Sequence, residues 1–389
     1  MDFSIDRDTA AAVEVEREWG EKEMRPVGLE ADREARPIPV DHPYFQRCLA
    51  RGLGRTRWRR PGDGAASRGS VVRSMLLAEE RAYWDRGVVV AEPGPGLPEG
   101  NVIAMGTEEQ KERYLGPFLE SDQPRWACFA MTEPGAGSDA AAIRTLARKD
   151  GDHWILNGAK CFIGGASRSD WILVQATLDP TQGRSAQRSF FVERGTPGLG
   201  GFKIEKKMGL KAYESTSFTL EDCRVPAANL LGGEERYERK AGFKGAMQTF
   251  NAGRPVIGAM AVGMGRAALD ESLRFAREHD LLDRVRVRDR VEAMARTIRG
   301  ARLVCLRAGW LAEQERPNVP EASMAKALGA QVCQEATGLG LELLGLAAGT
   351  GDHLIEKLYR DAKAMDIVEG TGQIQRVIMS RSLVGLKTR

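Results

Sequence analysis

The chain has 389 residues, 42% of them hydrophobic and 29% charged, with a net charge of only +3 at pH 7. This balance excludes a bulk electrostatic attraction to nucleic acid, and the length predicts two or three structural units. No apolar run approaches the roughly 20 residues of a membrane span, and the charged N-terminal stretch does not resemble a secretory signal. We therefore expect a soluble cytoplasmic protein that binds neither nucleic acid nor membrane.

Three stretches of different character follow one another. Residues 1–125 are mostly helical in pattern, as in VVRSMLLAEERAYW, with Pro- and Gly-rich loops such as EPGPGLPEG. Residues 126–235 contain short strand-like runs separated by turns, among them HWILNGAKCFIG and STSFTLEDCRV, which are typical of a small antiparallel barrel or sandwich. Residues 236–389 return to long helices. The order predicts an α+β multidomain protein that is mainly α.

The cysteines and histidines indicate neither a metal site nor a nucleophilic pair. Six cysteines and four histidines are scattered, without a C-x-x-C pair or metal-ligand spacing, so we expect reduced, buried cysteines. The segment AVGMGRAALD (261–270) matches G-x-G-x-x-A, but the residues before it continue a helix. Because a dinucleotide fingerprint needs a preceding strand, close helix packing explains these glycines better.

Two glycine-containing segments are candidates for ligand contact. TEPGAGSD (132–139) forms a tight loop whose N–H groups, with Thr132 and Ser138, suit an anionic or carbonyl-rich ligand. An ordinary interdomain turn explains this loop equally well. KCFIGGAS (160–167) ends a strand with Phe162 and two glycines, which let a flat ligand approach the backbone. A strand end with a bulge is the simpler explanation.

Glu369, in DIVEGTGQIQR (366–376), is the candidate base. It follows Ile367 and Val368 and precedes an expected helix. Aliphatic neighbours raise the pKa of a carboxyl group, which makes it a stronger base toward a weak carbon acid. A glutamate near a helix start also complements the helix dipole, and the residues alone favour this simpler role.

Four segments in order, TEPGAGSD, WILNGAKCFIGGAS, LEDCRVP and RDAKAMDIVEGTGQIQR, resemble the acyl-CoA dehydrogenase family. The resemblance covers nearly the whole chain. It implies an N-terminal helical domain (1–125), a middle β-barrel (126–235) and a C-terminal four-helix bundle (236–389). It also implies FAD as the cofactor, held between barrel and bundle.

The same resemblance implies roles for individual residues. The expected cofactor contacts are Phe129, Met131, Thr132, Ser138, Phe162, Ile163, Gly164, Thr371 and Gln373. The expected substrate contacts are Ser138, Phe250, Asn251, Arg254, Val368 and Gly370. Arg254 would lie beside the thioester and the base, and is expected to take part in catalysis.

Glu369 matches the family's usual catalytic base, in the sequence Glu-Gly-Thr. The implied reaction is the α,β-dehydrogenation of an acyl thioester, in which Glu369 removes a proton from Cα while Cβ transfers hydride to flavin N5. The Glu369 N–H and a flavin ribityl hydroxyl would bind the thioester oxygen. Some family members carry the base on a bundle helix near the position of Gly253, which has no side chain to serve here.

The chain departs from the family pattern around the cofactor. Gly164 lacks the hydroxyl that many members place near flavin N5. The stretch REHDLLDRVRVRDRV (277–291) is shorter than the family segment that reaches a neighbouring subunit's FAD, and Glu342 stands where the family has glutamine. These changes alter the intersubunit half of the expected FAD site.

The resemblance implies an electron-transfer flavoprotein as acceptor and a homotetramer or homodimer. The substrate is expected on coenzyme A or on an acyl carrier protein, as in secondary metabolism. Five arginines between Arg51 and Arg60 suit an acidic carrier protein, although they also fit a solvated loop. Two other functions stay open: a flavin-dependent acyl-thioester oxidase on the same fold, and a flavin-poor binding or scaffold protein.

Overall fold

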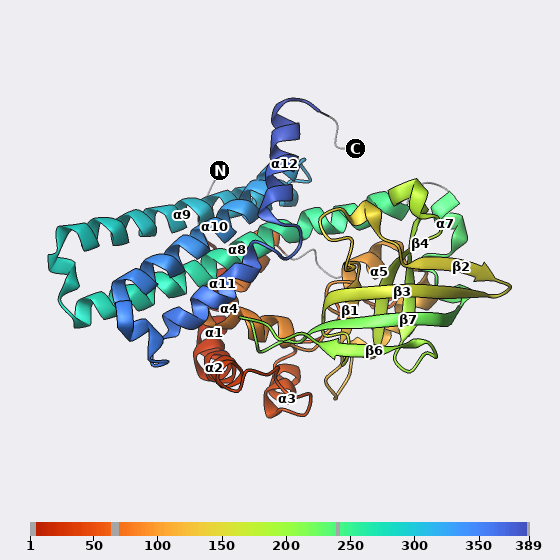
Figure 1. The fold of residues 1–389 in the computed structure, drawn as a ribbon, viewed down its shortest axis with the longest axis horizontal. Helices are drawn as coiled ribbons and strands as arrows, with labels where there is room; N and C mark the ends of the chain where they lie inside the picture. Colours follow the sequence, from red (N-terminus) through yellow and green to blue (C-terminus); the bar gives the residue numbers. More distant parts are fainter. Residues whose placement is uncertain (1–4, 64–69, 239–241, 387–389) are drawn as a thin grey trace.

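The computed structural model describes residues 5–63, 70–238 and 242–386, and the side chains of these residues except 238 and 242–252. Figure 1 shows N-terminal helices packed between a bundle of long helices on one side and a β-sheet on the other. The N-terminal helices are α1 (Arg7–Trp19), α2 (Arg25–Arg33), α3 (Pro43–Ala50), α4 (Val71–Ala91), α5 (Glu99–Met105) and α6 (Glu108–Leu115).

Helix α4 bends at Asp85. The backbone of Asp85 has φ −164° and ψ 112°, outside the helical region, although its neighbours on both sides are helical. Its buried carboxylate accepts hydrogen bonds from the Val88 N–H (2.9 Å) and from Lys357 Nζ (2.7 Å). Lys357 lies on α11 (Leu354–Met365), so a charge pair between distant segments fixes the bend.

The sheet follows the order β1-β4-β2-β3-β7-β6, with β5 also paired to β4. Its strands are β1 (Ala127–Ala130), β2 (Leu146–Asp150), β3 (His153–Gly164), β4 (Trp171–Thr177), β5 (Gln187–Glu193), β6 (Leu199–Ile204) and β7 (Ser215–Pro226). The expectation of an antiparallel barrel was only partly right, because β4 pairs in parallel with both β1 and β2. Every residue of β4 is buried because both of its faces are covered: Ile172, Val174 and Ala176 pack into one apolar core, and Trp171 and Leu173 into another.

The C-terminal part contains α7 (Glu234–Glu238), α8 (Gly242–Glu278), α9 (Val285–Glu313), α10 (Val319–Leu344), α11 and α12 (Gly372–Leu383). At about 1.5 Å per residue, α8 is roughly 55 Å long and runs from the sheet into the bundle (Figure 1). A Cβ on Gly263 would lie 2.0 Å from the Glu79 carbonyl oxygen of α4. The predicted close packing of the AVGMGRAALD helix is therefore confirmed.

The predicted fold class is confirmed: a mainly helical chain with a half-barrel sheet between N-terminal helices and a C-terminal bundle. The boundaries at residues 125 and 235 stay predictions. All six cysteines are buried and free. Across the described residues, no helix has the length and apolar character needed to cross a membrane, and no His, Cys, Asp and Glu side chains gather into a group that could hold a metal ion.

Candidate functional site

The two most distinctive sequence segments meet in space. Ser138, in the TEPGAGSD loop, and Thr371, in the EGTGQ segment, place their hydroxyl oxygens 3.4 Å apart across 233 residues of sequence. Thr371 is the N-cap of α12, and its hydroxyl accepts a hydrogen bond from the Ile374 N–H. The junction therefore combines hydroxyl groups with the start of a helix, which favours an anionic ligand.

The loop that carries Glu369 is fixed from several sides. The Asp366 carbonyl accepts hydrogen bonds from Lys326 Nζ and from the Gly372 N–H, both at 3.0 Å. Glu369 itself has φ +53°, a left-handed conformation that is uncommon for a residue other than glycine. Such strained backbone gathers at functional sites, because surrounding contacts must hold it.

The Glu369 side chain faces helix α8. A Cβ on Gly253 would lie 3.0 Å from Glu369 Oε2, so the absence of a side chain at Gly253 makes room for the carboxylate. Burial raises the pKa of Glu369 above its ordinary 4.5, although Arg86, Lys326 and Arg254 each oppose the rise. The carboxylate is thus a partly desolvated base whose ionised form is stabilised by three cations.

The cause of this burial differs from the predicted one. Ile367 is 64% exposed and does not cover the carboxylate, whereas Val368 packs against the core between α4, α8 and α10. Thr371, and not Glu369, is the residue whose side chain caps the start of α12. Tertiary packing, and not the local aliphatic run, therefore sets the environment of Glu369.

The end of β3 presents the other face of the site. Phe162 has φ +58° and its side chain is 69% exposed, because the pairing of β3 with β7 is irregular between Lys160 and Ile163. The bulge that the sequence suggested is confirmed. Ile163 points the opposite way, into the sheet core, where it is 3% exposed. Phe162 can therefore contact a ligand with its ring, and Ile163 only with its backbone.

A buried ion pair holds the TEPGAGSD loop against β3. Lys160 Nζ donates hydrogen bonds to Glu133 Oε1 (2.8 Å) and to the Met131 carbonyl (3.0 Å). The same carboxylate accepts from the N–H groups of Arg144 and Thr145. The Cys161 N–H donates to the Thr132 carbonyl, so the expected cofactor-binding ends of β1 and β3 form one rigid unit.

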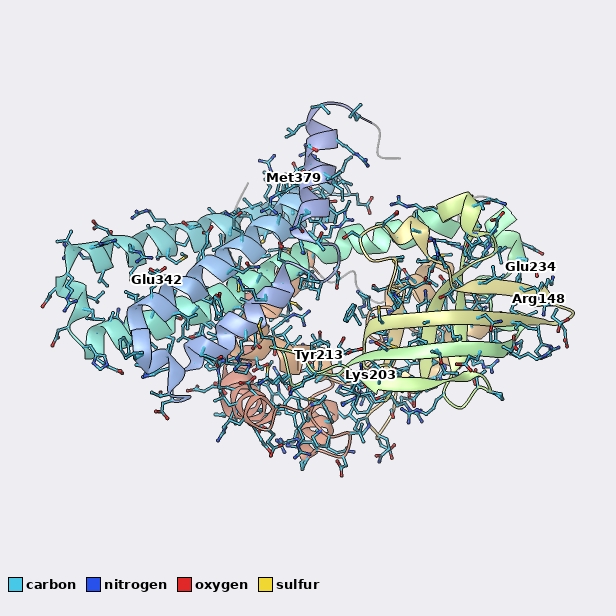
Figure 2. All side chains as sticks on the ribbon, viewed as in Figure 1. Arg148, Lys203, Tyr213, Glu234, Glu342 and Met379 are labelled. Atoms are coloured by element: carbon cyan, nitrogen blue, oxygen red, sulfur yellow. The ribbon has the colours of Figure 1, made fainter. Side chains whose placement is uncertain are left out.

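The described residues fit FAD in two respects: they offer hydroxyl and N–H donors, and their glycines leave space beside the backbone. A Cβ on Gly135 or Gly137 would meet no atom within 4 Å, so the backbone of this loop can be approached closely. A Cβ on Gly164 would lie 3.7 Å from the Tyr213 ring. Figure 2 shows Tyr213 on the loop between the N-terminal helices and the sheet. The exposed ring of Phe162, the unobstructed glycines of the TEPGAGSD loop and the hydroxyl groups of Ser138 and Thr371 thus supply the kinds of contact that FAD requires.

Not every expected contact is equally placed. Phe129 is partly buried against a cluster of apolar residues, and Gln373 is exposed on α12. The side chains of Phe250 and Asn251 lie outside the described residues. Glu342, expected near a neighbouring subunit's cofactor, pairs with Arg290 at 2.5 Å on the surface of the bundle (Figure 2). Its charge is therefore compensated within the chain.

Sequence reasoning missed two cations of the site. Lys326 is fully buried in α10, and burial lowers its pKa to about 8 while Asp366 and Glu369 oppose the change. Arg86 follows the bend of α4 at Asp85. The segment AEERAYWDRG reads as uninterrupted helix, so nothing in it predicts the bend that turns Arg86 toward Glu369.

Replacing Gly253 with alanine should lower kcat by about tenfold, which corresponds to roughly 1.4 kcal/mol of lost transition-state stabilisation. The added methyl group would press on Glu369 Oε2 and shift the base. Steady-state kinetics measure the effect, with melting temperature as the control. Alanine favours helix more than glycine does, so the variant should stay folded. An unchanged kcat in the stably folded variant would contradict the expectation, because it would show that the reaction tolerates a displaced Glu369 carboxylate.

Comparison with known proteins identifies the family. Three models match consecutive parts of the chain: the acyl-CoA dehydrogenase N-terminal domain at residues 7–122, the middle domain at 128–223 and the C-terminal domain at 240–384. The chain is 32% identical to an acryloyl-CoA reductase (NADH) of Anaerotignum propionicum, over 99% of this chain and 96% of the relative. It is 34% identical to the probable acyl-CoA dehydrogenase FadE25 of Mycobacterium tuberculosis, over 95% and 93%.

Comparison with a solved structure supports the same family. The butyryl-CoA dehydrogenase of Megasphaera elsdenii superposes with a TM-score of 0.87 at 28% identity, covering 99% of this chain and 100% of that one. The predicted family and its cofactor are confirmed. The chain belongs to the acyl-CoA dehydrogenase family and is an oxidoreductase that acts on CH–CH bonds with FAD as its cofactor.

Proposed function

We propose that this protein dehydrogenates an acyl thioester between Cα and Cβ, with Glu369 as the base that removes the α-proton. The observation that carries the proposal is the Glu369 carboxylate itself. It is held on a left-handed backbone, lies against Gly253, and has a pKa raised by burial. These features suit a positioned, partly desolvated base better than a surface glutamate.

Residues around Glu369 supply orientation and charge. The Glu369 N–H donates no hydrogen bond within the described part of the chain, so it is available to a thioester oxygen. Arg254 and Lys326 favour the ionised carboxylate and would offset negative charge that develops on the substrate. FAD, when bound, would accept the hydride, a proton with two electrons, that leaves Cβ. Phe162, Gly164, Thr132, Ser138 and Thr371 would hold it.

The pH dependence should report Glu369. A base acts when deprotonated, so kcat/KM should rise with pH along an acid limb whose midpoint lies above 4.5. Lys326→Gln should move this limb to higher pH, because Lys326 lowers the pKa of Glu369. Rate profiles of both proteins measure the shift. A limb that stays in place in Lys326→Gln would contradict the proposed electrostatics.

The structure offers limited support for a carrier-protein substrate. Arg51, Arg57 and Arg60 pair with Glu16, Glu99 and Glu112, respectively. The other two arginines of the loop donate to backbone carbonyls. Because three of the five charges are compensated, we propose a coenzyme A thioester as the first substrate to test.

We also propose an electron-transfer flavoprotein as acceptor and self-association into a homodimer or homotetramer. Helix α12 projects from the bundle (Figure 1), and the helix and the residue after it expose apolar side chains: Val377 (39%), Leu383 (87%) and Val384 (68%). An isolated monomer would leave them in water. Light scattering coupled to size exclusion measures the mass. A monomer at micromolar concentration would contradict this part of the proposal.

The reaction is tested by its product. Purified protein with FAD, an artificial electron acceptor and a panel of acyl-CoA thioesters should convert at least one of them to a product lighter by two hydrogens. Mass spectrometry detects this change. Formation of peroxide in place of acceptor reduction would favour an oxidase, whereas no conversion of any thioester would favour a binding protein.

A further inference from the structure

The turn that carries Glu369 contains two consecutive left-handed residues. Glu369 has φ +53° and Gly370 has φ +93°, and this conformation is unfavourable for a residue with a side chain. Before the turn, the N–H groups of Ile367 and Val368 both donate to the Ala364 carbonyl at 3.0 Å, which fixes the chain up to Val368. The direction of the Glu369 side chain therefore depends on what fixes the chain after it.

Gln375 supplies that contact from the first turn of α12. It is 0% exposed, and its Nε2 donates a hydrogen bond to the Gly370 carbonyl at 3.2 Å. A Cβ on Gly370 would lie 2.7 Å from the same Nε2, so the amide packs directly against the turn. Within the described part of the chain, no other hydrogen bond reaches the backbone of Glu369 or Gly370. Gln375 is therefore the residue that holds the turn on its far side.

The packing of α12 does not explain a glutamine at this position. Gln375 Oε1 is buried without a hydrogen-bond partner among the described residues, and an unpaired buried amide oxygen lowers stability. Methionine has a similar length, favours helix and would fill the space without this loss. Exchanging the amide oxygen and nitrogen would not help, because two oxygen atoms would then face each other at Gly370. The hydrogen bond to Gly370 is thus the contact that glutamine makes and an apolar side chain cannot.

We propose that Gln375 is a positioning residue for the reaction: its amide fixes the Gly370 carbonyl and thereby holds the Glu369 carboxylate in its working orientation. The proposal rests on the proposed dehydrogenase function. Gly253 leaves open space beside Glu369 Oε2, so the turn, and not a side chain at that position of α8, must aim the carboxylate. A base misplaced by about 1 Å can slow a reaction by roughly 100-fold. Gln375 acts through Glu369 and does not itself take up the proton.

The test removes the amide and keeps the packing. In the FAD-loaded protein, with a thioester that the parent converts, Gln375→Met should lower kcat by about 10- to 100-fold and change KM by less than about twofold. Melting temperature and flavin content should stay at the parent values, and Gln375→Leu, a second apolar variant, should give the same result. Gln331→Met, on an exposed glutamine of helix α10, should leave kcat unchanged. A fall in melting temperature or flavin content in both Gln375 variants would overturn the proposal in favour of a structural role.

A second readout separates positioning from a general loss of structure. Added to Glu369→Gln, Gln375→Met should lower the residual rate of flavin reduction by a smaller factor than in the parent, because the carboxylate that it positions is already absent. Equal factors in both backgrounds would overturn the proposal. An active parent with an equally active Gln375→Met variant would reject the positioning role alone, whereas a parent that converts no thioester would reject the dehydrogenase function on which it rests.

Discussion

Glu369→Gln should lower kcat by roughly 10²- to 10⁴-fold, the contribution expected of a general base, while FAD stays bound. Glutamine keeps the shape and the backbone of the site but cannot accept the α-proton. Steady-state kinetics with an artificial acceptor measure the loss, and the flavin spectrum verifies the cofactor. Glu278→Gln, on an exposed residue of α8, is the matched control and should keep full activity.

The same variant should affect stability with a defined sign. Because burial raises the pKa of Glu369 in the folded state, the fold loses stability as pH rises from 4.5 through that higher pKa. Glu369→Gln should remove this loss and melt no lower than the parent at neutral pH. A large drop in melting temperature would mean that the carboxylate has a structural role, and the kinetic result would then need a second variant, Glu369→Asp.

Lys160→Met should destabilise the protein by about 3–5 kcal/mol, because it leaves the Glu133 carboxylate buried without its counter-charge. The side chains of Lys160 and Glu133 are 0% and 8% exposed. Burial lowers the pKa of Lys160 to about 8, although Glu133 partly offsets this effect. Urea unfolding measures the change, and FAD retention should fall with it because the pair positions the TEPGAGSD loop.

An exposed pair on the same sheet gives the comparison. Arg224 and Asp150 lie 2.7 Å apart with side chains 48% and 44% exposed. Asp150→Asn should cost less than about 1 kcal/mol, since solvent screens the pair. The double variant Lys160→Met/Glu133→Gln should recover part of the lost stability. Equal costs for the buried and exposed pairs would contradict the role given to burial.

The order of helices, strands and helices was predictable because apolar periodicity is a local property of the chain. Glu369 could be singled out from four ordered motifs, and Gly253 from the absence of a competing base. The parallel pairings of β4 were not predictable, because register depends on strands far apart in sequence. The antiparallel expectation was therefore right for the pairs β2–β3, β3–β7, β4–β5 and β6–β7, and among the described strands missed only the two parallel pairings of β4.

The electrostatics of the site could not be predicted from the sequence either, because they too depend on contacts between distant segments. The bend that places Arg86 needs Lys357, which is 272 residues from Asp85. The exposure of Phe162 depends on a pairing irregularity with β7, and the burial of Glu369 depends on packing that Ile367 does not provide. Residue types are local information, whereas pKa shifts and ion pairs arise from contacts between distant segments.

The most direct test of the account is an anaerobic titration of the FAD-loaded protein with the thioester panel, followed by flavin absorbance. We predict that at least one thioester bleaches the flavin of the parent protein, and that the same thioester leaves the flavin of Glu369→Gln oxidised. Equal bleaching in both proteins would contradict the assignment of Glu369 as the base.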